Sequence, residues 1–160
     1  MTVKGDKGDA TPEARLKSYV DRLDPKNQKL IRSVRAAVRK RFPTANELAY
    51  DYKRFFVLGY SPTDRGIDSI VAIAARDTGV SLYFSQGPKL PDPKRILLGS
   101  GKQTRFIQVE AAGQLARPEV EALIAATIDQ AKIPFSTQGK GGLIIKSSDT
   151  KKRPRKIPTK

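Results

Sequence analysis

Apolar residues recur at three- and four-residue spacing in three stretches of the chain, and each stretch is predicted to form an amphipathic helix. The first helix is expected to begin at Thr11-Pro12, where Thr is the N-cap and Pro takes the first helical position. The second begins at the same kind of signal, Asp24-Pro25, and ends before Pro43. The third begins at Arg117-Pro118 and ends before Pro134. Proline therefore delimits all three predicted helices.

Between the second and third helices the apolar period changes to two, which predicts β-strands. One strand is expected to run from Leu48 through Leu58 and to turn at Gly59-Tyr60-Ser61-Pro62. The other predicted strands are residues 69–75, 80–84, 105–109 and 143–145. The link Asp77-Thr78-Gly79 between the first two of these is short enough for an antiparallel hairpin.

The order of these elements predicts an α+β two-layer sandwich, in which an antiparallel sheet packs on the N- and C-terminal helices. Residues 12–148 are expected to form this single domain. Residues 1–11 have almost nothing to bury and residues 149–160 lack an apolar period, so both are expected to be disordered tails. No stretch approaches the ~20 apolar residues that span a bilayer, and the first residues lack the apolar run of a signal peptide. The chain is therefore expected to be cytoplasmic.

The chain of 160 residues contains no Cys and no His, which excludes several functions. Thiol nucleophiles, zinc fingers and iron–sulfur ligation require Cys, and a Ser-His-Asp triad requires His. Gly99-Ser100-Gly101-Lys102 lacks both the earlier Gly and the following Ser or Thr of a phosphate loop. Gly59-Tyr60-Ser61-Pro62-Thr63 lacks the second Gly of a nucleophile elbow. We therefore expect a binding domain without a cofactor or metal site, although an enzyme that uses Tyr, Lys or Asp as acid or base is left open.

Positive charge is concentrated in part of the chain. Lys and Arg outnumber Asp and Glu by 31 to 16, and residues 13–42 alone hold ten basic and three acidic side chains. A helix face without mixed signs attracts polyanions, so a nucleic acid, another polyanion or a phosphorylated ligand is the expected partner. The alternative is a basic surface without a specific partner. The predicted anion-binding residues are Arg32, Arg35, Arg39, Lys102, Arg105, Lys151, Lys152 and Arg153.

An aromatic and basic run, Tyr50-Asp51-Tyr52-Lys53-Arg54-Phe55-Phe56, has two interpretations. Single-stranded nucleic acid binds through aromatic rings that stack on bases and through cations that contact phosphates. Strand alternation also places Tyr50, Tyr52, Phe56 and Leu58 on one face, where they can form a core against the helices, and we favour this interpretation. Tyr52 and Tyr83 are the residues predicted to line a ligand pocket.

Several short segments occur in an order that a known family shares. They are Leu16-Lys17-Ser18-Tyr19-Val20, Phe42-Pro43, Val71-Ala72-Ile73, Val80-Ser81-Leu82-Tyr83-Phe84, Leu97-Leu98-Gly99-Ser100-Gly101-Lys102 and Arg105-Phe106-Ile107. Over residues 16–135 the chain resembles the YdhG-like family, a bacterial domain of unknown function with a frataxin-like fold. The resemblance implies a sheet covered on one side by the N- and C-terminal helices and, as an alternative function, a frataxin-like iron or metal chaperone. Iron binding of that kind relies on an acidic ridge along the first helix, whereas the first helix pair here is basic.

Overall fold

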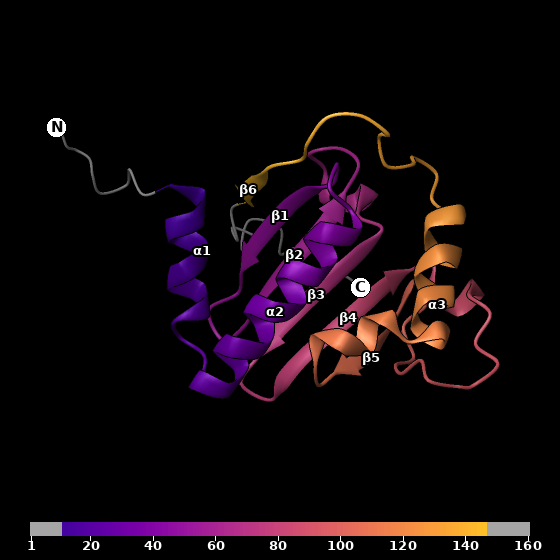
Figure 1. Cartoon of the computed structure of the whole chain (residues 1–160), viewed down its shortest axis with the longest axis horizontal. Coiled ribbons are helices and arrows are strands. Elements are labelled where there is room, and N and C mark those ends of the chain that lie inside the picture. The colour runs from indigo at the N-terminus through magenta and orange to yellow at the C-terminus, as the bar shows by residue number, and fades with distance from the viewer. Residues whose placement is uncertain (1–10, 147–160) are drawn as a thin grey trace, which may run out of the picture.

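Helices and strands follow one another in an α+β fold, which the computed structural model describes over residues 11–146 (Figure 1). The helices are α1 (Pro12–Val20), α2 (Pro25–Arg41) and α3 (Pro118–Asp129). The strands are β1 (Asn46–Asp51), β2 (Phe56–Ser61), β3 (Val71–Arg76), β4 (Gly79–Ser85), β5 (Thr104–Val109) and β6 (Leu143–Lys146). Short 3₁₀ helices, η2 (Gly66–Asp68), η3 (Gly87–Lys89) and η4 (Ala112–Ala116), lie in the connections. Apart from Thr11, the two predicted tails lie outside the described residues.

The first two helices begin at the predicted N-caps. The Thr11 hydroxyl accepts a hydrogen bond from the Ala14 N–H at 3.1 Å, and the Asp24 carboxylate accepts one from the Asn27 N–H at 2.9 Å. Each cap satisfies an N–H group that the first helical turn would otherwise leave unpaired. Within residues 11–146, no helix is long and apolar enough to cross a membrane.

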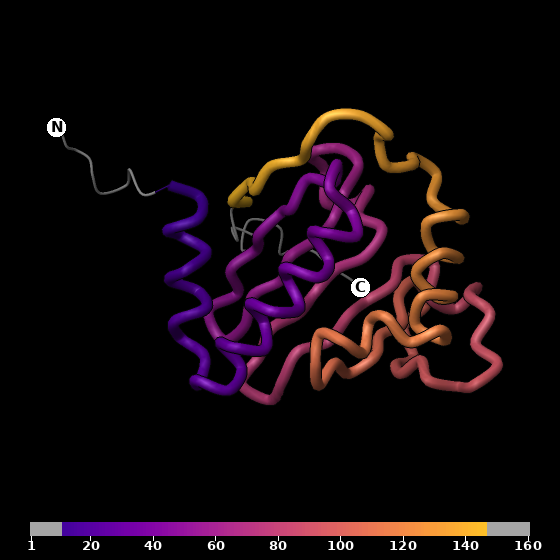
Figure 2. The backbone as a smooth tube through the Cα atoms, viewed as in Figure 1, coloured from indigo at the N-terminus to yellow at the C-terminus, as the bar shows by residue number. Residues whose placement is uncertain are grey.

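One sheet contains all six strands in the order β5-β4-β3-β2-β1-β6. Neighbouring strands are antiparallel except for β6, which pairs in parallel with β1. The prediction of an antiparallel sheet is therefore wrong at this edge, and the sheet is mixed. The chain leaves α3, passes over one end of the sheet and returns beside β1 (Figure 2). Gly141 N–H donates to the Pro43 carbonyl at 3.1 Å and Glu47 N–H donates to the Gly142 carbonyl at 2.9 Å, which sets the parallel register.

The strand predicted from Leu48 to Leu58 is a hairpin of two strands. Asp51 at the end of β1 pairs with Phe56 at the start of β2. Between them Lys53 has a left-handed φ of 71°, and its N–H donates to the Asp51 carboxylate at 2.8 Å. The predicted turn at residues 59–62 is consequently wrong, because residues 59–61 belong to β2. The predicted shared face is wrong as well, since Tyr50 pairs with Val57 and lies on the sheet face opposite Phe56 and Leu58.

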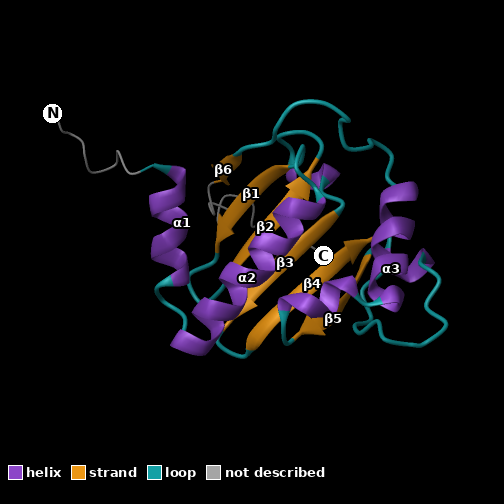
Figure 3. Cartoon of the chain, viewed as in Figure 1, coloured by secondary structure: helices purple, strands orange, loops and turns teal. Residues whose placement is uncertain are grey.

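Helices α1, α2 and α3 cover one face of the sheet, which confirms the predicted α+β sandwich (Figure 3). The core lies between the two layers, and its centre includes Val34 of α2, Leu58 of β2 and Ile73 of β3, all fully buried. Loops cover part of the opposite face. Gly66 lies against the Tyr50 hydroxyl, so that a side chain at this position would collide with the tyrosine.

Candidate anion-binding sites

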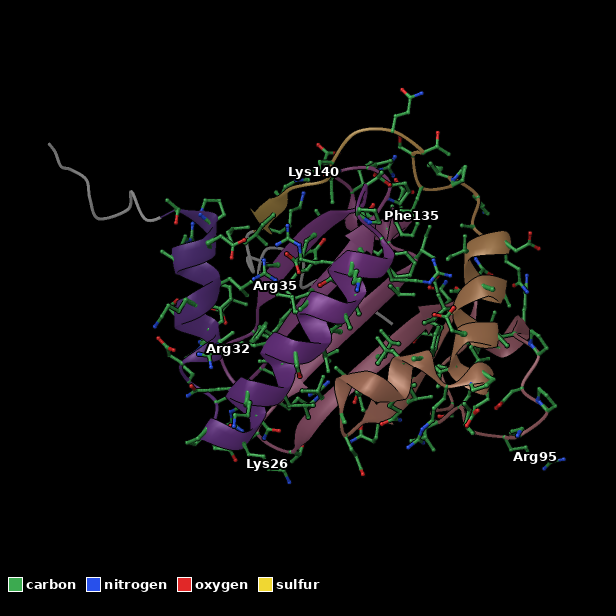
Figure 4. The ribbon with its side chains drawn as sticks, viewed as in Figure 1. Lys26, Arg32, Arg35, Arg95, Phe135 and Lys140 are labelled. Carbon is green, nitrogen blue, oxygen red and sulfur yellow. The ribbon has the colours of Figure 1, made fainter. Side chains whose placement is uncertain are left out.

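The predicted anion-binding residues separate into two places in the structure. Arg32, Arg35 and Arg39 line a cavity between α1 and α2, here called the α1–α2 cavity. Figure 4 labels the first two of these arginines, which extend from α2. Lys102 lines a pocket at one end of the sheet together with Tyr83, here called the loop-end pocket. Arg105 lines neither of these, and the candidates Lys151, Lys152 and Arg153 lie outside the described residues.

Arg35 already has two carboxylate partners. Its Nε and Nη2 donate to Oε2 and Oε1 of Glu47 at 2.9 and 2.7 Å. Its Nη1 and Nη2 donate to Oε1 and Oε2 of Glu13 at 3.1 and 2.9 Å. Glu47 is 2% exposed, whereas the Glu13 side chain in the first turn of α1 is 59% exposed. An incoming anion therefore has to compete with Glu13 for Arg35.

The Glu47 carboxylate is also held from the side of the sheet. The Tyr60 hydroxyl donates to Glu47 Oε2 at 2.5 Å, and Arg39 Nη1 lies 3.4 Å from Glu47 Oε1. Buried charges are tolerated when they are paired and hydrogen-bonded, and both conditions hold for Glu47. Glu13 belongs to the same cluster of charged side chains, and its hydrogen bonds with Arg35 lower the pKa of its carboxyl group. The cluster joins α1, α2, β1 and β2.

Replacing Tyr60 with phenylalanine is expected to reduce the loss of stability at alkaline pH. Burial first, and the Glu47 carboxylate second, raise the pKa of the Tyr60 hydroxyl well above its ordinary value of 10. The protonated hydroxyl therefore stabilises the folded state at pH values below the pKa that this tyrosine has in the unfolded chain. This stabilisation is lost as the pH rises from the unfolded-state pKa towards the higher folded-state pKa. Urea unfolding between about pH 8 and pH 11 should show a steeper decline for the wild type than for Tyr60→Phe. Equal slopes would contradict the prediction.

The α1–α2 cavity is an open groove with a charged rim above an apolar floor. Its volume is about 550 Å³. Its floor consists of core side chains from both helices and from β2, each at most 7% exposed, and they are Leu16, Val20, Ile31, Phe56 and Leu58. The charged lining residues are Glu13, Lys17, Arg32, Arg35 and Arg39. The charged rim, and not the apolar floor, is therefore the part of this cavity that solvent and solutes reach.

The loop-end pocket is formed where η2, the ends of β4 and α3 and the start of β5 meet, and its volume is about 720 Å³. Its lining includes four cations, Arg65, Lys89, Lys102 and Lys132, and one carboxylate, Asp68. Asp68 accepts a hydrogen bond from the Thr63 hydroxyl at 2.8 Å and lies 4.0 Å from Arg65 Nε. Over the described part of the chain, no carboxylate forms an ion pair with any of the three lysines. The pocket therefore presents positive charge that protein groups do not neutralise.

Tyr83 supplies an aromatic surface in the loop-end pocket. Its ring stacks on Phe106 with 4.8 Å between the centroids and 27° between the planes. Tyr52, the other predicted pocket residue, lies in the β1–β2 turn at the opposite end of the strands and stacks on Phe55. Arg105 does not line the loop-end pocket, and its guanidinium donates to the carbonyls of Gly101 and Thr104. Only Lys102 and Tyr83 among the predicted residues therefore come together here.

Several residues of the two sites were not predicted from the sequence. Glu13, Glu47 and Tyr60 complete the arginine cluster, and Lys89 and Lys132 line the loop-end pocket. Lys89 is the last residue of η3 and Lys132 follows α3, and no local pattern distinguishes the two from other surface lysines. Among residues 11–146, no three carboxylates lie close enough together to hold a metal ion.

No protein-family model, curated protein or solved structure matches the chain. The resemblance to the YdhG-like family stays a prediction. The chemistry of the α1–α2 cavity and of the loop-end pocket is therefore the basis on which a function is inferred.

Proposed function

We propose that the protein is a binding domain for a phosphorylated small molecule, which it holds in the loop-end pocket. The observation that carries the proposal is the charge of the lining. Arg65 and three lysines surround one pocket, and Asp68 is the only carboxylate among the lining residues that the structure describes. A phosphate group needs several cationic donors at close range, and lysine is a common phosphate ligand. No carboxylate of residues 11–146 forms an ion pair with these lysines, so the ligand need not displace one of them.

The ring of Tyr83 supports a ligand that carries a planar group. Phe106 holds one face of this ring, which leaves a flat surface of fixed orientation in the pocket. Aromatic rings stack on nucleobases with little dependence on the base, and lysines next to the ring can contact a phosphate of the same ligand. A mononucleotide therefore matches the lining better than inorganic phosphate does. The pocket lies between loops, which favours a small ligand over a long polyanion.

Replacing Lys102 or Lys132 with glutamine is expected to weaken the binding of AMP by about ten-fold, the effect of losing one charge-assisted hydrogen bond. Isothermal titration calorimetry with AMP, and separately with inorganic phosphate, measures the change. Lys26→Gln is the matched control, because Lys26 is an exposed lysine at the start of α2 and lies at the other end of the molecule (Figure 4). Wild-type protein that binds neither probe saturably would overturn the proposal.

A single-stranded oligonucleotide is the second probe in this experiment, because a nucleic acid is the larger anionic partner that the charge predicts. Tighter binding of the oligonucleotide than of AMP, with a steep decrease at high salt, would replace the small-molecule proposal with a nucleic-acid one. The frataxin-like iron-chaperone alternative has no observation in its favour within residues 11–146, where no cluster of three carboxylates is found.

A further inference from the structure

Asp68 is the one carboxylate among the described residues that line the loop-end pocket. We propose that it accepts a hydrogen bond from a ribose hydroxyl of the bound ligand, so that the pocket selects ribonucleotides over deoxyribonucleotides. This role rests on the nucleotide binding proposed above and narrows the class of ligand for the same pocket. Three features of the structure support it: how the carboxylate is held, where it lies relative to Tyr83, and the charge that it adds to a basic pocket.

The Asp68 carboxylate is fixed at one oxygen and open at the other. Its Oδ2 accepts a hydrogen bond from the Thr63 hydroxyl at 2.8 Å and lies 4.0 Å from Arg65 Nε. The Thr63 hydroxyl also accepts a hydrogen bond from the Arg65 N–H at 3.0 Å, so this side chain is itself held in place. Within residues 11–146, no group donates a hydrogen bond to Asp68 Oδ1. The Asp68 side chain is 16% exposed, so a ligand can reach an acceptor whose position is already set.

Asp68 and Tyr83 lie at the same end of two neighbouring strands. Ala72 of β3 pairs with Tyr83 of β4. Two residues further toward the loops, the Ile70 carbonyl accepts a hydrogen bond from the Ser85 N–H at 3.1 Å. Asp68 precedes Ile70 by two residues, so it follows Tyr83 along the direction of the strands, and both line the pocket. A base stacked on the Tyr83 ring can therefore place the ribose, which is bonded directly to the base, beside Asp68.

The charge of Asp68 determines which part of a nucleotide it can contact. A carboxylate repels a phosphate group, for which the pocket has its three lysines. An ionised carboxylate is an acceptor only, and the ribose hydroxyls are uncharged donors that every ribonucleotide carries. A site that hydrogen-bonds a hydroxyl of its ligand discriminates against the analogue without it, because the polar group of the site is then left unpaired.

Isothermal titration calorimetry with AMP and 2′,3′-dideoxy-AMP tests the proposal. Wild-type protein is expected to bind AMP about ten-fold more tightly than the dideoxy nucleotide, the effect of one hydrogen bond to a charged group. Asp68→Ala is expected to reduce this ratio to about one, and Asp68→Asn, which keeps an acceptor without the charge, to about three. The ratio is the quantity to compare. Both nucleotides carry the same phosphate, so the loss of a negative charge near the phosphate affects both equally.

Asp64→Asn is the matched control, because Asp64 is an exposed carboxylate of the same loop that does not line the pocket. This variant should keep the wild-type ratio. Inorganic phosphate should bind to Asp68→Ala at least as tightly as to the wild type, which establishes that the pocket of the variant is intact.

IMP, which lacks the amino group of adenine, separates the ribose from the base. A substitution of Asp68 that changes the ratio of AMP to IMP binding, and leaves the ratio of AMP to dideoxy-AMP binding unchanged, would overturn the proposal. Wild-type protein that binds AMP and dideoxy-AMP equally would overturn this proposal alone. Wild-type protein that binds neither AMP nor phosphate would overturn the proposed function as well.

Discussion

Replacing Glu47 with alanine is expected to lower the free energy of unfolding by about 3–5 kcal/mol, the cost of removing one partner from a buried ion pair. The substitution leaves the Arg35 guanidinium facing a site from which two of its hydrogen-bond acceptors have been removed. It also leaves the buried hydroxyl of Tyr60 without its acceptor. Urea unfolding at neutral pH measures the loss.

Glu13→Ala is the matched control for Glu47→Ala. It removes a carboxylate from the other edge of the same guanidinium, but the Glu13 side chain is 59% exposed. Its expected effect is about 0–1 kcal/mol. Replacing both members of the buried pair, in Arg35→Met with Glu47→Leu, is expected to cost less than Glu47→Ala alone, because the only carboxylate that loses its Arg35 partner is then the exposed Glu13. Equal losses in the free energy of unfolding for Glu47→Ala and Glu13→Ala would show that burial does not determine how much each ion pair contributes to stability.

Replacing Gly141 with alanine is expected to lower the free energy of unfolding by about 1–3 kcal/mol and to loosen β6. A Cβ atom at Gly141 would collide with the carbonyl group of Ala45, which is backbone and cannot rotate away. The segment would have to move off β1, which strains the hydrogen bond from Gly141 to Pro43 and the one from Glu47 to Gly142. Hydrogen exchange at the β6 amides should therefore accelerate more than exchange at β3, in the middle of the sheet.

Gly142→Ala is the matched control, one residue further along the same segment. A Cβ atom at Gly142 meets nothing within 4 Å, so this variant is expected to keep wild-type stability and exchange. The pair separates a steric effect from the general effect of removing a glycine, which reduces the freedom of the unfolded chain in both variants. Similar exchange rates in the two variants would contradict the predicted collision.

The parts of the fold that local chemistry determines could be predicted from the sequence. Thr11 and Asp24 cap their helices as expected, because an N-cap depends only on a side-chain oxygen and an N–H group three residues ahead. The prediction of a β3–β4 hairpin is confirmed for a similar reason. Gly79 has a φ of 135°, a conformation that glycine adopts readily, and it follows the Asp77-Thr78 turn directly.

Two features of the sheet depend on contacts that local patterns do not contain. The β1–β2 turn has neither Gly nor Pro and is closed by the Asp51 carboxylate, which accepts hydrogen bonds from Lys53 and from Arg22, a residue between the first two helices. The pairing of β6 joins Leu143 to Glu47 across the rest of the domain. The three-residue apolar segment 143–145 indicates a strand but carries no information about its partner or direction.

In the candidate sites, too, local sequence patterns predict some features, whereas contacts between distant segments determine the others. The helical spacing of Arg32, Arg35 and Arg39 correctly predicts that they share a side of α2, and they do line one cavity. Helical periodicity cannot show that the Glu13 and Glu47 carboxylates face Arg35, since these residues belong to α1 and β1. The cations of the loop-end pocket come from four separate segments, so no spacing in the sequence connects them.

During synthesis, the outer edge of β1 leaves the ribosome long before the strand that covers it. Glu47 pairs with Leu143, so nearly a hundred residues must be added before the first hydrogen bonds between β1 and β6 form. Until then β1 presents unpaired N–H and C=O groups, which are a template for pairing with another chain. A nascent chain that ends after α3 would hold three helices and five strands and would still have this open edge. Resistance to aggregation is therefore acquired only when the last few residues of the domain have been made.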